Sequence, residues 1–327
     1  MTIDQMDRTI QYIQKNINGQ NNSVVFFGGE PLLEYKLINE FIKKTSKLNL
    51  SYILYTNGIL LNSIPLYILK PIRTIIVSVD GDRESHEKHR GSGTYDKVIH
   101  NLESIKPNLD SFFIGRITAE EETNIYNSVT NIIDYVDAIY WQIVNKPKFN
   151  NSLAFINNYK INLQRLFNFW LYHFKNGKCY NIIPFQSIIS SLLFDYRNDG
   201  LSFRCRAGSS LQVMDIEDNI YWCDEYIGDP KGIIGNINSS GPNMPYESHR
   251  DIFPDCKKCQ ISNICLGRCK KVLKEYPTDV IRIYCELTRY LVNIITEKID
   301  DVNNIIINRK YSLESFYNVP YCTEEIP

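Results

Sequence analysis

The sequence predicts an α/β protein with a parallel sheet or barrel, followed by a smaller cysteine-rich domain. Over residues 1–145, short β-branched or aromatic segments alternate with helical patterns. Repeated strand–helix units favour parallel strands, because parallel neighbours need a crossover connection. After residue 204, seven cysteines follow the pattern C-x17-C, a gap, then C-x2-C-x5-C-x3-C-x15-C. A chain of 327 residues is long enough to bury one large core and one small one.

The elements are expected in a regular order along the first half of the chain. Candidate strands occupy residues 23–27, 51–55, 74–79, 111–117 and 138–144, and helical spacing marks residues 32–48, 95–105 and 124–135. Residues 146–203 read as a mostly helical connector. The cysteine-rich domain is expected over residues 204–327, with a helix from 287 to about 302 and a polar tail.

Composition narrows the function. A net charge of −1 and a pI near 6.5 give no basic field for nucleic acid or an acidic membrane surface. The first residues lack the apolar core of a signal peptide, and no run approaches the roughly 18 apolar residues needed to span a bilayer. We therefore expect a cytoplasmic protein, in which nine cysteines are better explained by metal binding than by disulfides.

Polar residues follow each candidate strand, where a parallel sheet places its chemistry. Gly28 and Gly29 let the backbone approach a ligand, and Glu30 can accept a hydrogen bond from an ammonium group. The alternative is a plain strand-to-helix turn with Pro31 at the helix start. Ligand contact and turn formation are both open for three further polar residues at strand ends, Asn57, Ser78 and Asp80.

Three other polar side chains carry weaker predictions. Arg116 ends a candidate strand and suits a carboxylate ligand, although it can equally be a surface residue on the rim. His86 and His89 lie in a charged segment without other ligand residues in register, so we expect both to be solvated and assign them no role.

The cysteines are too numerous for one site with four ligands. Closely spaced thiolates converge on a soft metal at little loop-closure cost, and seven suggest one site with four and one with three. This is the arithmetic of paired iron–sulfur clusters. Tetrahedral zinc is the competing interpretation, since C-x2-C with C-x3-C also suits four-thiolate sites.

Taken together, the motifs resemble the radical SAM enzymes with a SPASM auxiliary-cluster domain. The matching segments are FFGGEPLL, YTNG, SVDG, the cysteine series and CDEYIGDPKGIIGNI, and the resemblance covers nearly the whole chain. It implies a partial (β/α)6 barrel that binds S-adenosylmethionine (SAM) and a [4Fe–4S] cluster, with two auxiliary [4Fe–4S] clusters behind it. Family members carry C-x3-C-x2-C after strand 1, but this sequence has no cysteine before Cys179. We therefore expect that strand 1 and its cluster loop are missing, and that SAM and the third cluster bind only if that segment is restored.

The resemblance also implies roles for individual residues. The 28–31 loop would bind the SAM amino group, Ser78 and Asp80 would lie near the ribose, and Asn57 and Arg116 would contact the cofactor. Two sets of cysteines are implied for the auxiliary clusters: Cys256, Cys259, Cys265 and Cys285 for one, and Cys205, Cys223 and Cys269 for the other. For the second cluster the fourth ligand stays open between Cys179, Asp199 and a substrate thiol, and Cys322 is expected to be free. Asp218 replaces a family glycine and still tolerates a turn conformation.

The first functional hypothesis is post-translational modification of a ribosomal peptide, by a thioether or carbon–carbon crosslink, with the chain inactive as given. The alternative is anaerobic formylglycine formation on a sulfatase, supported by Cys223-Asp224, in which Asp224 would accept a proton. Asp224 can also be a simple surface acid. A non-catalytic iron–sulfur or electron-transfer protein is a third hypothesis, and a zinc module is the fourth. The expected partners are a peptide or protein substrate and an electron donor such as a flavodoxin or ferredoxin.

Overall fold

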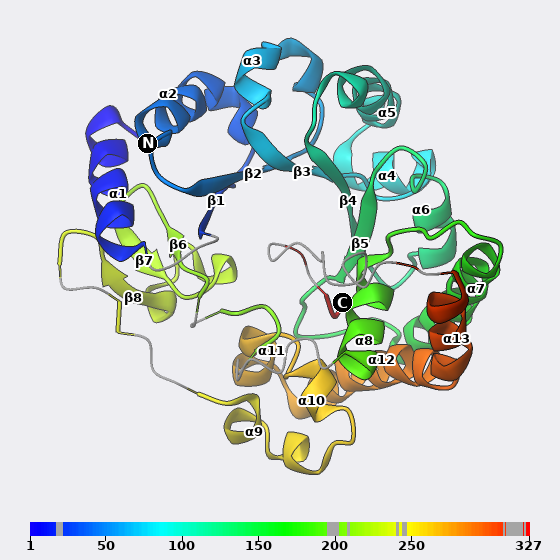
Figure 1. Cartoon of the computed structure of the whole chain (residues 1–327). Coiled ribbons are helices and arrows are strands. Elements are labelled where there is room, and N and C mark those ends of the chain that lie inside the picture. The colour runs from blue at the N-terminus through cyan, green and yellow to red at the C-terminus, as the bar shows by residue number, and fades with distance from the viewer. Residues whose placement is uncertain are drawn as a thin grey trace. The chain divides into compact units, whose positions relative to one another are not determined.

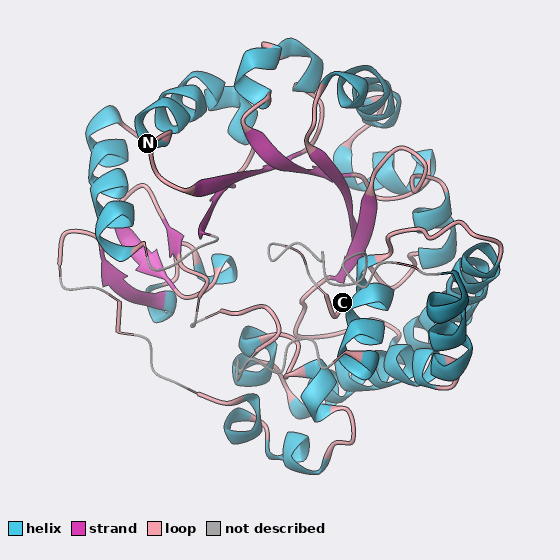
Figure 2. Cartoon of the chain, viewed as in Figure 1, coloured by secondary structure: helices cyan, strands magenta, loops and turns pink. Residues whose placement is uncertain are grey.

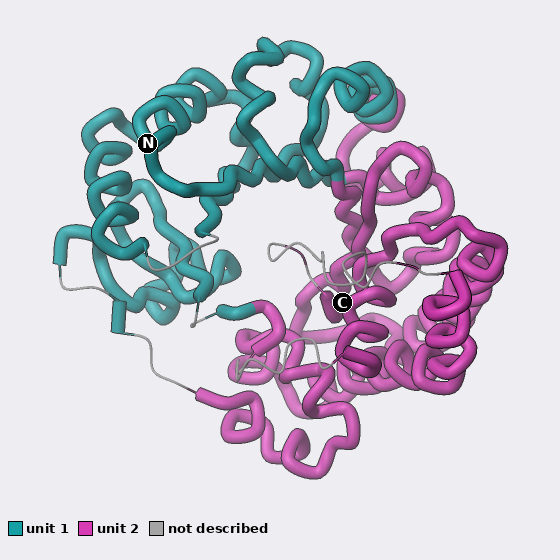
Figure 3. Tube along the Cα trace, in the orientation of Figure 1, with its two compact units in different colours: residues 1–78, 97–113, 206–246 teal, residues 79–96, 114–205, 247–327 magenta. Residues whose placement is uncertain are grey.

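The computed structural model describes residues 1–17, 22–194, 203–207, 210–239, 242–243, 247–309, 311, 323 and 325–327. The chain divides into two compact units (Figure 3). Unit 1 contains residues 1–78, 97–113 and 206–246, and unit 2 contains residues 79–96, 114–205 and 247–327. Both units combine residues from before and after residue 203. The predicted boundaries at residues 145 and 203 therefore stay predictions.

Unit 1 contains three parallel strands, β1 (Asn22–Phe26), β2 (Leu50–Thr56) and β3 (Ile72–Ser78) (Figure 1). Val24 is paired with Tyr52, and Leu54 with Ile75. The residues of β3 are almost all buried, as expected for a parallel strand covered on both faces. The associated helical elements are α1 (Ile3–Asn16), η1 (Pro31–Glu34), α2 (Tyr35–Thr45), η2 (Leu61–Ser63), α3 (Leu66–Leu69), most of α5 (Thr94–Ile105) and η3 (Lys106–Asn108).

A second, antiparallel sheet in unit 1 comprises β6 (Val213–Met214), β7 (Asn219–Tyr221) and β8 (Ile233–Asn236), with η4 (Asp224–Tyr226) and η5 (Pro230–Gly232) after β7. Helix α1 contacts the β6–β7 hairpin through polar side chains. Arg8 forms an ion pair of 2.6 Å with Asp218, and the Tyr12 hydroxyl donates to Gln212 at 2.8 Å. Asp218 has a φ of 68°, so it adopts the turn conformation that the sequence allowed.

Unit 2 contains most of β4 (Phe112–Ala119) and β5 (Ala138–Ile143), which pair in parallel with Gly115 opposite Ile139. Its helical elements, seen in Figure 2, are α4 (Arg83–Arg90), α6 (Ile125–Thr130), α7 (Ser152–Lys175), α8 (Ile183–Leu193), α9 (His249–Ile252), η6 (Pro254–Lys258), α10 (Ser262–Cys265), α11 (Lys270–Glu275), α12 (Thr278–Thr296) and α13 (Ile299–Arg309). Trp141, Trp170 and Phe185 are fully buried, and the Phe185 ring contacts both tryptophan rings. This aromatic cluster joins β5 to α7 and α8.

The α/β class with parallel strands is confirmed, and all five predicted strands form within two residues of their expected bounds. Three helix predictions need correction. Residues 31–34 form a separate 3-10 turn before α2, the helix expected over 124–135 ends at Thr130, and the helix expected from 287 begins at Thr278 and is followed by α13. Within the described part of the chain, no helix is long and apolar enough to cross a membrane.

Candidate functional site

The loop after β1 ends in a carboxylate that organises two loops of unit 1. Glu30 accepts hydrogen bonds from the Thr56 hydroxyl at 2.9 Å, from the Asn57 amide at 2.8 Å and from the Leu32 amide at 3.0 Å. A carboxylate has about four acceptor positions, so these three donors leave one for a ligand. Glu30 therefore joins the loops after β1 and β2 and keeps some capacity to bind an ammonium group.

The glycines before Glu30 border open space. Gly28 and Gly29 are exposed, and no described atom lies within 4 Å of the position that a Cβ would occupy on either residue. Gly28 has a φ of 146°, which disfavours other residues there. Pro31 begins η1, as the turn interpretation requires. The backbone of this loop is thus accessible to a ligand.

Asn57 and Ser78, also in unit 1, have a backbone contact and a buried position that fit structural roles. The Asn57 side chain accepts from the Ile59 amide at 2.9 Å, which is the turn contact proposed as its alternative role. Ser78 is buried at the end of β3. Contact of either residue with SAM stays a prediction.

Asp80 in unit 2 is 1% exposed and is held by protein donors. Its carboxylate accepts from Arg90 Nε at 2.6 Å and from the Thr118 amide at 2.8 Å, and His89 Nδ1 lies 3.6 Å away. The Asp80 amide donates to His86 Nδ1 at 3.2 Å. These contacts connect the end of β3 with α4 and β4, and a role near the SAM ribose stays a prediction.

The expectation of two solvated histidines is wrong for His86. Its segment forms α4, which Asp82 caps, and His86 is the buried residue of that helix. Burial lowers the pKa of His86 and therefore favours its neutral form. His89 is also only partly exposed.

Arg116 lies on β4 and its side chain is half-buried. Its guanidinium donates from Nη2 to Gln142 Oε1 at 2.5 Å, so it is anchored to the neighbouring strand β5. Its predicted contact with a SAM carboxylate is not tested by this geometry.

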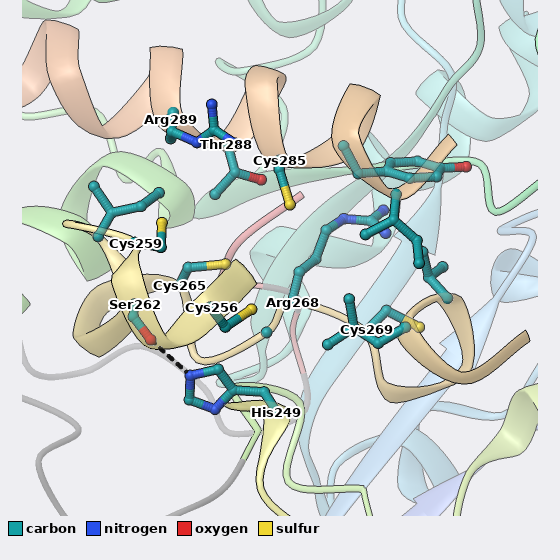
Figure 4. A pocket seen from close by; sticks show the side chains of 16 residues that line it. His249, Cys256, Cys259, Ser262, Cys265, Arg268, Cys269, Cys285, Thr288 and Arg289 are labelled. Atoms are coloured by element: carbon teal, nitrogen blue, oxygen red, sulfur yellow. Dashed lines mark hydrogen bonds between the residues drawn. The ribbon is translucent and has the colours of Figure 1, made fainter. Parts of the chain in front are cut away.

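The candidate metal site is a pocket in unit 2 that is lined by five cysteines (Figure 4). Cys256, Cys259, Cys265 and Cys285 also influence each other electrostatically. Burial together with Cys285, Cys256 and Cys259 raises the pKa of the Cys265 thiol to about 12. Burial with Cys285 and Cys259 raises the pKa of Cys256 to about 11. The structure thus brings together the four cysteines that the resemblance assigns to one cluster.

The pocket offers several thiols, the side chains that hold iron–sulfur clusters. Among the residues that the structure describes, no three His, Cys, Asp or Glu side chains are placed to hold one metal ion. In a [4Fe–4S] cluster each thiolate binds a different iron, so the sulfurs stand farther apart than around one zinc. Arg268 Nε also lines this region, is buried and lacks a hydrogen-bond partner among the described residues. A cluster with its bound sulfides would supply an anionic partner for Arg268.

The cysteines predicted for the second cluster are placed in both units. Cys269 lies in the same pocket, and its Sγ accepts from Asn145 Nδ2 at 3.7 Å. In unit 1, Cys223 is buried with its Sγ 3.5 Å from Asp224 Oδ1, and Asp224 is exposed at the start of η4. Cys205 is half-buried in unit 2. A cluster shared by Cys205, Cys223 and Cys269 stays a prediction.

The candidates for a fourth ligand are only partly described. Cys179 is half-buried, and burial raises the pKa of its thiol to about 12. Asp199 and Cys322 lie outside the described residues. The structure also adds two residues that sequence reasoning missed, Asn145 and Arg268. Only Arg268 could have been found from the sequence, because it stands between Cys265 and Cys269.

Comparisons with known proteins agree with the motifs. Residues 1–100 match the 4Fe-4S single cluster domain family, although those residues contain no cysteine. The cysteine-type anaerobic sulfatase-maturating enzyme of Clostridium perfringens is 26% identical over 314 residues, covering 86% of this chain and 84% of that protein. The radical SAM cyclopropyl synthase TigE of Paramaledivibacter caminithermalis is 23% identical over 318 residues, covering 89% of this chain and 65% of that protein.

Solved structures show the same fold. Native anSMEcpe with bound AdoMet aligns with a TM-score of 0.72 at 20% identity and covers 92% of this chain and 91% of that chain. A structure of native anSMEcpe with bound AdoMet and the Kp18Cys peptide aligns with a TM-score of 0.68 at 21% identity and covers the same shares. The parallel strands and helices of this chain therefore follow an arrangement that in those proteins binds AdoMet.

Proposed function

The chain is a relative of the radical SAM enzymes, and we propose that it is a maturase of the anaerobic sulfatase-maturating type. Its substrate would be a cysteine side chain in a protein, which is oxidised to formylglycine. The observation that carries this proposal is the similarity to a cysteine-type anaerobic sulfatase-maturating enzyme over 86% of the chain. The adjacent Cys223 and Asp224 support it, because they pair an expected cluster ligand with an exposed carboxylate.

The residues of the chain take the following parts in this proposal. Bound SAM would supply the radical that removes a hydrogen atom from the substrate. Glu30 would hold the ammonium group of SAM, and the open backbone at Gly28 and Gly29 would lie against it. Asp224 would accept the proton released as the substrate is oxidised. The auxiliary clusters would take up the remaining electron, and water would then convert the resulting thioaldehyde into the aldehyde with release of hydrogen sulfide.

Crosslinking of a ribosomal peptide, the first hypothesis from the sequence, is less favoured by these comparisons. It remains the second candidate because of the similarity to the cyclopropyl synthase, of which the match covers 65%. An open iron on a three-cysteine cluster could bind the thiol of such a peptide. An iron–sulfur protein without catalysis is the third candidate, since residues 1–100 provide no thiolate for a SAM-binding cluster.

The test is anaerobic reconstitution of the 327-residue chain with iron and sulfide, followed by iron counting and EPR with and without SAM. Two auxiliary clusters predict about eight irons, and about twelve irons with a SAM-dependent change in the spectrum would indicate a third cluster that binds SAM. The Cys265→Ala/Cys285→Ala variant should lose about four irons. Zinc binding with little iron would contradict the proposal.

Substrate choice is tested with reconstituted protein whose EPR spectrum changes when SAM is added. A sulfatase-derived peptide with a cysteine is the first substrate, and mass spectrometry detects replacement of its CH2SH group by an aldehyde. Asp224→Asn should slow this reaction and leave the iron content unchanged, while Glu225→Gln is the matched control on the next exposed acid. A crosslinked product with a cysteine-rich peptide, and no aldehyde, would favour the second candidate.

A further inference from the structure

Three consecutive residues at the end of β5, 143–145, are held by side chains from the cysteine-rich segment of unit 2. Arg268 donates from Nη2 to the Ile143 carbonyl at 2.9 Å and from Nη1 to Asn145 Oδ1 at 3.0 Å. The Tyr284 hydroxyl donates to the Val144 carbonyl at 2.8 Å. The Arg268 guanidinium also lies 4.6 Å from the centre of the Tyr284 ring. This set of contacts is too extensive for a surface arginine, and Arg268 is only 7% exposed.

The backbone at and immediately before Arg268 is strained. Leu266, Gly267 and Arg268 have φ values of 49°, 76° and 50°, so three consecutive residues adopt a left-handed conformation. Each non-glycine residue in this region costs about 1–2 kcal/mol. A Cβ on Gly267 would lie 2.4 Å from His249 Cβ, so the turn is also tightly packed. Strain of this kind persists where the structure needs a particular side-chain direction.

Arginine chemistry decides the orientation of the Asn145 amide. Arginine has only hydrogen-bond donors, so the atom of Asn145 that faces Arg268 must be its oxygen. The NH2 group must then face the other way, where Cys269 Sγ lies at 3.7 Å. Figure 4 shows Arg268 running between Cys285 and Cys269 in the pocket. Arg268 thus forces Asn145 to act as a donor toward the sulfur.

We propose that Arg268 is a positioning residue that holds Asn145 as a hydrogen-bond donor to the Cys269 thiolate, and that this contact raises the reduction potential of the cluster that Cys269 helps to bind. The inference rests on the proposed cluster content. A hydrogen bond to a cluster sulfur withdraws negative charge, and this favours the reduced, more negative state. The end of β5 therefore adjusts how readily this cluster accepts an electron.

The test is an EPR-monitored redox titration of reconstituted protein. Asn145→Leu removes the donor, and Asn145→Asp keeps an oxygen toward Arg268 but places a second oxygen against Cys269. Both changes should shift the midpoint potential of one cluster to a more negative value and leave the other cluster unchanged. Arg268→Lys keeps the charge but loses the two-pronged contact, so it should shift the same cluster in the same direction. Arg282→Gln, which removes an exposed cation on the same helix as Cys285, is the control and should shift neither.

The outcomes separate this inference from the function it rests on. Unchanged potentials in both Asn145 variants, at wild-type iron content, would overturn the role of Asn145. A normal potential in Arg268→Lys would overturn the positioning role of Arg268 and leave only its charge. Loss of about four irons in both Asn145 variants would make the contact structural and also overturn tuning. Wild-type protein that binds no cluster would instead refute the proposed cofactors.

Discussion

Glu325 forms a buried ion pair with Arg204, and replacing Glu325 tests how much this pair contributes to the stability of unit 2. Arg204 Nε lies 3.0 Å from Glu325 Oε2, and both side chains are only 2% exposed. The Ser187 hydroxyl donates to the same carboxylate oxygen at 2.7 Å. Glu325→Ala removes the anion and leaves a guanidinium at a site without access to water.

The expected loss follows from this burial. Breaking a buried pair by removing one partner costs about 3–5 kcal/mol, because the remaining charge is desolvated without compensation. The assay is urea unfolding followed by the fluorescence of the buried tryptophans, Trp141 and Trp170. Lys178→Ala is the matched control, since it breaks an ion pair with Asp134 whose side chains are 56% and 68% exposed. An exposed pair of this kind contributes about 0–1 kcal/mol.

A double variant isolates the cause. Arg204→Met combined with Glu325→Leu removes both charges, so it should recover part of the stability lost in Glu325→Ala. The reasoning fails if Glu325→Ala costs no more than Lys178→Ala. It also fails if the double variant loses as much stability as the single variants Arg204→Met and Glu325→Leu lose together, because that result would trace the loss to packing rather than to an uncompensated charge.

Three further predictions concern the free energy of unfolding. Gly91→Ala should cost about 1–2 kcal/mol, because alanine is strained at the φ of 101° found there. Gly81→Ala should cost about 1–3 kcal/mol more, because Gly81 has a φ of 91° and an added Cβ would also lie 2.6 Å from a backbone atom. Equal losses in the two variants would contradict this. Burial alone would raise the pKa of Glu121, but hydrogen bonds from backbone amides and a lysine outweigh burial and lower this pKa to about 2. The ionised carboxylate therefore stabilises the folded protein above pH 4.5, and this stabilisation is lost as the pH falls toward 2. Glu121→Gln should remove that part of the pH dependence of the free energy of unfolding. Asp218→Ala keeps the left-handed strain and loses the ion pair with Arg8, so it should destabilise the protein more than Asp218→Gly, and the reverse order would refute this account.

The parallel strands were predictable because their signal is local. Strand β3 is a run of β-branched residues that is buried on both faces, and the sequence marks both its composition and its polar end. The helix expected over 124–135 was overextended for a physical reason. Ile132, Ile133 and Val136 are buried after α6 has ended, so apolar spacing continued through a segment of turns. Burial produces the same pattern whether or not the backbone stays helical.

Side-chain direction was the information that the sequence lacked. The segment around His86 is so highly charged that solvation was the natural expectation, yet its helix turns that histidine inward to the Asp80 amide. Glu30 was expected to bind a ligand. It also contacts Thr56 and Asn57, which lie 26 and 27 residues farther along the chain in the loop after β2. Pairings at such separations depend on tertiary packing, which local patterns do not contain.

We expect the backbone conformation at residues 266–268 to separate two cysteines whose spacing leaves their cluster assignment ambiguous. Cys265 and Cys269 are separated by three residues, so spacing alone allows them to share one site. The left-handed turn at 266–268 changes the chain direction between them. Cys285, Cys256 and Cys259 raise the pKa of the Cys265 thiol, whereas Cys269 Sγ accepts a hydrogen bond from Asn145 Nδ2. If the turn sorts the two thiols in this way, relaxing it should mix the sites. Leu266→Gly should preserve the sorting because glycine adopts the same φ freely, whereas Gly267→Val should disturb it, and iron counts with separate redox potentials for the two variants would distinguish these results.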